Sequence, residues 1–157
     1  MTLEEKSIIK LFENNELDIS RLYALYSKNI PGHADFWRQL SQEEIAHAKA
    51  IAKAFEDAGK GDDHFKENNF TRGIIKYISD FVSEKTIEAE NDPPAHGKAL
   101  ETALRVEQSM LEKKCFDIFI PTDESLKEVL KKLNRETEKH VASLRQELET
   151  LRKKEIL

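Results

Sequence analysis

Acidic and histidine side chains interrupt the apolar stripes of several helical segments, and this feature constrains the fold more than any other. Between residues 34 and 58, one helix face carries Phe36, Leu40, Glu44, His47, Ile51, Ala54 and Ala58. Spacings of three and four residues predict an amphipathic helix whose stripe points inward. A buried polar group needs a partner, so Glu44 and His47 must find theirs on another helix.

Clusters of glycine, proline and polar residues divide the chain into five helical segments. The breaks contain "NIPGHAD", "AGKGDDHFKENN", "NDPPAHG" and "IPTDES". We expect helices at about 3–29, 34–58, 71–90, 96–119 and 123–154. A length of 157 residues is that of one domain with a sizeable core, so we expect a single domain over 1–157.

Three further segments carry polar residues on their stripes. Segment 3–29 has Ile9, Phe12, Glu16, Ile19, Tyr23, Tyr26 and Ile30, and segment 96–119 has Leu100, Leu104, Glu107, Leu111, Cys115 and Ile118. Segment 123–154 has Leu126, Leu130, Leu133, Thr137, His140, Leu144, Leu148 and Leu151. Segment 71–90, with Ile74, Ile78, Phe81 and Val82, is shorter, and we expect it to be a crossover.

Two helical hairpins joined by a long crossover are typical of an all-α, four-helix bundle of the ferritin-like kind. Glu16 lies about as far before the first turn as Glu44 and His47 lie after it, and Glu107 and His140 flank the second turn almost as evenly. At about 1.5 Å of rise per residue, each hairpin brings its polar residues to one level. The sequence therefore predicts a shared polar layer in the bundle core.

Burying three carboxylates together is costly unless protons or cations neutralise them. Carboxylate and imidazole groups are suitable ligands for iron, manganese or zinc. Di-iron and di-manganese bundles use one glutamate from each of two helices and Glu-x-x-His from each of the other two. Glu16, Glu107 and Glu44-x-x-His47 fit this pattern.

The fourth helix departs from the di-metal pattern. His140 is in place, but Thr137 stands three residues earlier, where the pattern has glutamate. Glu136 lies about 100° round the helix and would reach the site only by leaning across from the flank of the stripe. The second half of the site is therefore expected to bind its metal more weakly or through water.

The sequence resembles the rubrerythrin branch of the ferritin-like superfamily. The resemblance lies in "ENNELDISRLYALYSKNIPGHADFWRQLSQEEIAHAKAI" and "ALETALRVEQSMLEKKCFDIF", and it extends over nearly the whole chain. It implies a non-haem di-iron site that reacts with peroxide or dioxygen, as in a peroxidase or a ferroxidase-type oxidoreductase. It also implies that Glu16, Glu44, His47, Glu107 and His140 are the ligands.

The chain departs from this family in three respects. Thr137 replaces a glutamate, Met110 stands one turn after Glu107 where rubrerythrins carry another glutamate, and the rubredoxin domain is absent. The single Cys115 excludes the cysteine pairs that would hold a rubredoxin-type iron. Reducing equivalents must then come from an external electron donor or from ferrous iron itself.

Composition and charge limit the cellular location and the classes of binding partner that we expect for the protein. A net charge of -5 argues against a nucleic-acid partner, and no segment resembles a signal peptide or a membrane span. With one cysteine, a reducing, cytoplasmic location is expected. The leucine stripe at the end of segment 123–154 favours a homodimer, because no other helix is long enough to cover it.

Several residues have plainer interpretations beside the functional ones. Tyr23, Trp37 and Phe36 are typical core residues, although Tyr23 could donate a hydrogen bond near the site. Glu43 and Glu13 are expected to be solvated or to lie beside the ligands, with Glu13 replacing Glu16 if the register shifts. The turn histidines are expected to be solvated; these are His33, His64 and His96.

Two alternatives to an oxidoreductase remain open at the level of sequence. Thr137 favours a metal-binding or storage module with one tight site at Glu16, Glu44 and His47 and no turnover. The other alternative is a metal-free scaffold on the same fold, whose polar layer is held by hydrogen bonds and a trapped proton.

Overall fold

The chain is all-helical in the parts that this computed structural model describes, which are residues 3–57, 69–112 and 124–156. Five helices and no strand occur there: α1 (Leu3–Asn29), α2 (Ala34–Asp57), α3 (Asn69–Asn91), α4 (His96–Glu112) and α5 (Glu124–Ile156). The predicted helices agree with these, and the predicted residues 58, 113–119 and 123 lie outside the described ranges. None of the helices described is both long and apolar enough to cross a membrane.

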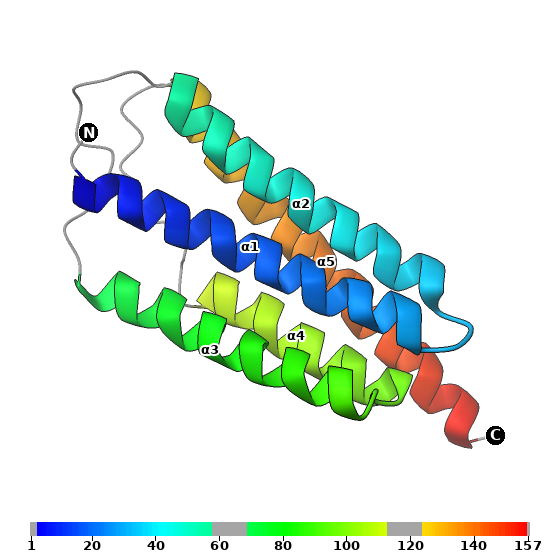
Figure 1. The fold of residues 1–157 in the computed structure, drawn as a ribbon. Helices are drawn as coiled ribbons and strands as arrows, with labels where there is room; N and C mark the ends of the chain where they lie inside the picture. The colour runs from blue at the N-terminus through cyan, green and yellow to red at the C-terminus, as the bar shows by residue number, and fades with distance from the viewer. Residues whose placement is uncertain (1–2, 58–68, 113–123, 157) are drawn as a thin grey trace.

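A tight turn folds α2 back along α1 (Figure 1). The backbone nitrogen of Ile30 donates to the carbonyl oxygen of Tyr26 at 2.9 Å, which closes the last turn of α1. Gly32 then adopts a φ of 82°, in the left-handed region that glycine enters without strain. Ser27 Oγ donates to the carbonyl oxygen of Ala34 at 2.7 Å, which ties α1 to the start of α2.

Helix α3 carries the chain back along the length of the bundle (Figure 1). It packs on α1 and touches α4, and it buries Ile75, Ile78, Val82 and Ala89. The predicted crossover is therefore a full-length helix whose apolar face covers the groove beside α1 and α4. Its path places the start of α4 at the same end of the molecule as the α1–α2 turn.

Helices α4 and α5 form a second antiparallel pair (Figure 1). Gly97 lies where a side chain would meet Leu151, since a Cβ there would be 3.3 Å from Leu151 Cδ2. Leu148 is buried and Leu151 packs against the core, so the chain itself covers the leucine stripe of α5. The stripe gives no reason to expect a second copy, and the homodimer stays a prediction.

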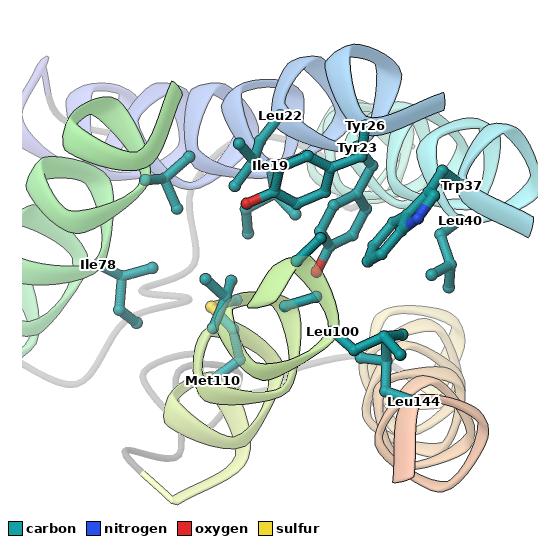
Figure 2. Close-up of a cluster of buried hydrophobic side chains, with 14 of the residues drawn as sticks. Ile19, Leu22, Tyr23, Tyr26, Trp37, Leu40, Ile78, Leu100, Met110 and Leu144 are labelled. Carbon is teal, nitrogen blue, oxygen red and sulfur yellow. The ribbon is translucent and has the colours of Figure 1, made fainter. Parts of the chain in front are cut away.

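The apolar core joins all five helices, and aromatic side chains from α1 and α2 are its largest members (Figure 2). Phe12, Tyr23, Tyr26 and Trp37 are each no more than 2% exposed. On α4 the buried face is displaced from the predicted stripe, because Ala103 and Met110 are buried while Leu104 and Leu111 are half-buried. Small residues at Ala99 and Ala103 let α4 approach its neighbours closely on that side.

Candidate metal centre

Five acidic and histidine side chains lie buried together in the bundle. They come from α1, α2, α4 and α5, and none is more than 4% exposed: Glu16, Glu44, His47, Glu107 and His140. The structure therefore brings together the residues that helix periodicity placed on one level. Only α3 contributes no side chain to this group.

Two serines align α1 and α2 at the level of the buried acids. Ser20 Oγ donates to the carbonyl oxygen of Ser41 at 2.9 Å, and Ser41 Oγ donates to that of Ser20 at 2.8 Å. Ser20 lies one turn after Glu16, and Ser41 lies three residues before Glu44. This reciprocal pair fixes the register that places Glu16 opposite Glu44.

The buried side chains form two groups of three that share Glu44. In the first, His47 Nδ1 lies 3.3 Å from Glu44 Oε2 and 3.8 Å from Glu16 Oε2. In the second, His140 Nδ1 lies 3.0 Å from Glu44 Oε1 and 3.4 Å from Glu107 Oε1. The three ligand atoms of each group lie within 4.8 Å of one another, so each group could hold one metal ion.

Two further acids, Glu136 and Glu43, contact the outer nitrogen (Nε2) of the two imidazoles. His47 Nε2 lies 2.7 Å from Glu136 Oε2, and His140 Nε2 lies 2.8 Å from Glu43 Oε2. An Nε2–H donated to a carboxylate fixes the ring and leaves Nδ1 directed toward the buried glutamates. This is the arrangement in which a metal-binding histidine is usually held.

Three buried atoms at the centre have no hydrogen-bond partner among the residues that the structure describes: Glu44 Oε1, His47 Nδ1 and His140 Nδ1. His140 Nδ1 and Glu44 Oε1 lie 3.0 Å apart, but without the alignment of a hydrogen bond. Unpaired polar atoms at such depth destabilise a protein unless something binds them. Nitrogen and carboxylate oxygen are both metal ligands, so the donor set fits a divalent cation.

The charges of the centre shift the pKa values of its members. Burial alone would lower the pKa of each imidazole, but Glu16 and Glu44 raise that of His47 to about 11, and Glu107 and Glu44 raise that of His140 to about 11. Burial and the nearby Glu107 and Glu16 hold the pKa of Glu44 well above its ordinary value. Without metal, imidazolium protons therefore balance the carboxylates, and a cation would take their place.

Glu107 shows the opposite shift. Burial would raise the pKa of its carboxyl, but the adjacent His140 outweighs burial and lowers that pKa below the ordinary value. Tyr23 also helps, because its hydroxyl donates to Glu107 Oε1 at 2.9 Å. Burial and the Glu107 charge raise the pKa of Tyr23 well above 10.0, so Tyr23 stays a donor.

The second half of the centre differs from the expectation for Glu136. Its carboxylate does not lean into the group around His140; it contacts the outer nitrogen of His47 and is 33% exposed. Thr137 is buried, and its hydroxyl donates to the carbonyl oxygen of Leu133 at 2.9 Å. With Thr137 folded back on its own helix, Glu44 is the one carboxylate that both groups share.

The sequence did not predict the specific contacts of Glu43, Glu13 and Tyr23. Glu43 lies beside the ligands, as one of its interpretations required, whereas Glu13 is paired with Lys10 at 3.5 Å on the side of α1. Tyr23 is buried and also donates to Glu107. Its position two turns after Glu16 was the only signal of that second role. Cys115 and His64 lie outside the described residues.

A third group, His33, His96 and Glu147, lies near the α1–α2 turn. Glu147 Oε1 is 3.3 Å from His96 Nε2 and 3.9 Å from His33 Nδ1. Trp37 Nε1 donates to His96 Nδ1 at 3.2 Å, so the proton of the neutral imidazole must sit on Nε2, the atom that would bind the metal. These hydrogen bonds disfavour a metal ion here.

The expectation that His96 is solvated is wrong, because its side chain is buried between Trp37 and Glu147. The partners come from α2 and α5, far from His96 in the sequence. Glu147 lies three residues after Leu144, beside the apolar stripe of α5, and this was the one available signal.

Comparison of the chain with known protein families, with curated proteins and with solved structures found no match.

Proposed function

We propose that this chain is a non-haem iron protein of the ferritin-like superfamily, of the rubrerythrin type, which binds two metal ions and acts on peroxide or dioxygen. One observation carries the proposal. Two imidazole Nδ1 atoms and an oxygen of the shared Glu44 carboxylate meet in the core without hydrogen-bond partners among the described residues, and each imidazole is flanked by a further glutamate. Two antiparallel hairpins joined by a helix that returns along the bundle support the ferritin-like arrangement (Figure 1).

Each group of residues has a role in this proposal. Glu16 and His47 would hold one ion, Glu107 and His140 the other, and Glu44 would bridge them. Glu136 and Glu43 keep the imidazole Nε2–H groups engaged, so that each Nδ1 faces inward. The metal ions would bind and polarise the oxidant and exchange electrons with it. Manganese or zinc suits the same ligands, and iron is favoured because the proposed reaction is a redox reaction.

A small cavity lies between α2 and α5, beside the outer edge of the centre. Its volume is about 230 Å³, and Glu43 and His140 are in its lining; the other lining residues are Phe36, Gln39, Leu40, Lys139 and Ser143. A molecule the size of hydrogen peroxide fits this space. Electrons would come from an external donor or from ferrous iron, because a single cysteine cannot form a rubredoxin-type site.

The test is to load the purified protein with Fe²⁺ under anaerobic conditions, remove free metal, and count iron per chain by elemental analysis. Peroxide consumption by the loaded protein is then compared with that of free Fe²⁺. The proposal expects two ions per chain and consumption faster than that by free iron. A chain that retains no metal, or a rate equal to that of free iron, would overturn it.

A pair of variants provides the matched control. Glu16→Gln removes a proposed ligand and should lower the iron count, while Glu13→Gln changes an acid one turn earlier that pairs with Lys10 outside the centre. Equal iron counts in the two variants would contradict the assignment of Glu16.

A module that binds one ion without turnover is the second candidate. The shared Glu44 favours it, because an ion that takes both Glu44 oxygens leaves only Glu107 and His140 for a second ion. One retained ion per chain and no peroxide consumption would support this candidate. Thermal stability unchanged by chelation would instead support a metal-free scaffold, in which imidazolium ions balance the buried carboxylates.

A further inference from the structure

A line of aromatic and imidazole rings runs from the centre to the end of the bundle. It begins at Tyr23, whose hydroxyl donates to Glu107 Oε1 at 2.9 Å. The ring of Trp37 follows, with its centroid 5.6 Å from that of Tyr23 (Figure 2). Tyr23 and Trp37 are both fully buried.

The line continues through two histidines to the surface. Trp37 Nε1 donates to His96 Nδ1 at 3.2 Å, and the ring of His96 stacks on that of His33 with centroids 3.5 Å apart and planes 4° apart. The His33 side chain is 34% exposed, so the line ends in solvent. We call Tyr23, Trp37, His96 and His33 the aromatic relay.

The hydrogen bond from Trp37 to His96 would allow Trp37 to lose an electron and a proton together. An indole in an apolar core has no base nearby to accept its Nε1 proton, but here the neutral imidazole of His96 can accept it. The far nitrogen of that imidazole lies 3.3 Å from Glu147 Oε1, a carboxylate that would stabilise the resulting imidazolium. Burial lowers the pKa of His96, which keeps Nδ1 free to accept a proton at neutral pH.

We infer that the aromatic relay carries electrons, one at a time, from an external one-electron reductant at His33 and His96 to the buried centre while peroxide is reduced. The inference rests on the proposed function. Hydrogen peroxide takes up two electrons and two protons and yields two water molecules, and each electron comes from one reductant molecule.

Within each step, the relay residues return to their starting state. With metal bound, Tyr23 would supply one electron to the centre while its phenolic proton moves along the 2.9 Å hydrogen bond to Glu107 Oε1. Trp37 would then restore the electron to Tyr23, which takes its proton back, and the Trp37 Nε1 proton would move to His96 Nδ1. Finally the external reductant returns the electron to Trp37, and His96 returns the proton.

The experiment uses the full chain loaded with Fe²⁺, mixed with hydrogen peroxide in excess over iron and frozen at short times for electron paramagnetic resonance. The excess is needed because two ferrous ions supply both electrons that the first peroxide takes up, and only further peroxide draws electrons from the relay. Trp37 is the only tryptophan in the chain, so protein grown on ring-deuterated tryptophan identifies its radical by the change in hyperfine splitting. We expect a Trp37 radical in the wild-type protein. Ascorbate, as the one-electron reductant, should speed its decay.

Three variants test the order of the relay. Tyr23→Phe removes the hydroxyl on Glu107 and should abolish the Trp37 radical. Tyr26→Phe is the matched control and should retain it, because the Tyr26 ring also lies near Trp37, at 4.8 Å, but its hydroxyl bonds Thr102. His96→Leu keeps the indole, removes its proton acceptor, and should also abolish the radical.

The possible failures are distinguishable. Metal retained and peroxide consumed, but with no Trp37 radical in the wild-type protein, would overturn the relay and leave the proposed function standing. A Trp37 radical that survives both Tyr23→Phe and His96→Leu, with metal content and helical circular dichroism unchanged, would also overturn the relay. A wild-type protein that binds no metal or consumes no peroxide would overturn both proposals.

Discussion

His47 and His140 each carry a proton that a metal ion would have to displace. The pKa of each imidazole is about 11 in the metal-free protein, so both are charged near neutral pH. Binding through Nδ1 must release these protons, and the apparent metal affinity should rise about tenfold per pH unit for each proton released. Calorimetric titration in buffers of different ionisation enthalpy measures the release directly. An affinity that does not change between about pH 6 and 8 would contradict ligation by these histidines.

The same residues determine how the stability of the metal-free protein depends on pH. The folded pKa of about 11 lies above the ordinary value of 6.5, so the folded chain binds more protons between these limits. The stability that the two histidines contribute is therefore complete below pH 6.5 and is lost as the pH rises toward 11. Glu107 acts in the opposite sense, because its lowered pKa contributes stability above 4.5 that is lost as the pH falls.

Urea unfolding in the presence of a chelator, at a series of pH values, measures this dependence. The free energy of unfolding should fall between about pH 7 and 10. The double variant His47→Gln, His140→Gln should show a smaller slope over that interval. Equal slopes in the variant and the unaltered chain would show that the histidines do not carry the effect.

Thr137 is the residue at which the second half of the centre can be tested. Thr137→Glu would place a carboxylate three residues before His140, in the position equivalent to Glu44 relative to His47. Metal binding should tighten, and the metal-free protein should become less stable, because a further buried charge has no partner. Thr137→Gln, of nearly the same size but uncharged, should destabilise less and should not tighten binding. Elemental analysis and thermal unfolding with chelator report the two effects.

At the scale of helices, the Ser20 and Ser41 pair sets the register between α1 and α2. Each buried hydrogen bond should contribute about 1 kcal/mol to the free energy of unfolding. Ser20→Ala and Ser41→Ala should each cost about that amount, and the double variant should cost less than the sum because the bonds are reciprocal. Both variants should also weaken metal binding through Glu16 and Glu44. Strict additivity, with unchanged metal binding, would show that the pair does not control the register.

Helix bounds and the level of the polar residues were predictable because they depend on local periodicity and on a fixed rise per residue. Glu16 and Glu107 lie on their stripes, and counting residues from each turn suffices to align them. The direction of Glu136 was not predictable, because a flank position lets a long side chain reach either edge of the facing imidazole. The partners of His96 were hidden for another reason: Trp37 and Glu147 lie on remote helices, and only the packed bundle brings them together.

At the scale of the whole molecule, a bound metal would join four helices that apolar packing and several inter-helix hydrogen bonds also hold together. A ligand present at 100 times its dissociation constant stabilises the folded state by about 2.7 kcal/mol. Hydrogen exchange followed by mass spectrometry should show slower exchange in α1, α2, α4 and α5 on metal addition, and little change in α3, which supplies no ligand. Equal protection of α3 would indicate that the metal acts on the fold as a whole rather than through the centre.

The position of Glu44 between the two histidines has a consequence for how the protein would bind two metal ions in succession. Two sites that draw on one carboxylate cannot bind independently, since the first ion changes the charge and the orientation of the ligand that the second must use. The two affinities are then linked by a coupling free energy, equal in whichever order the ions enter. Half-filled and fully filled chains would be distinct chemical species, and the metal concentration around the protein would decide which of them prevails.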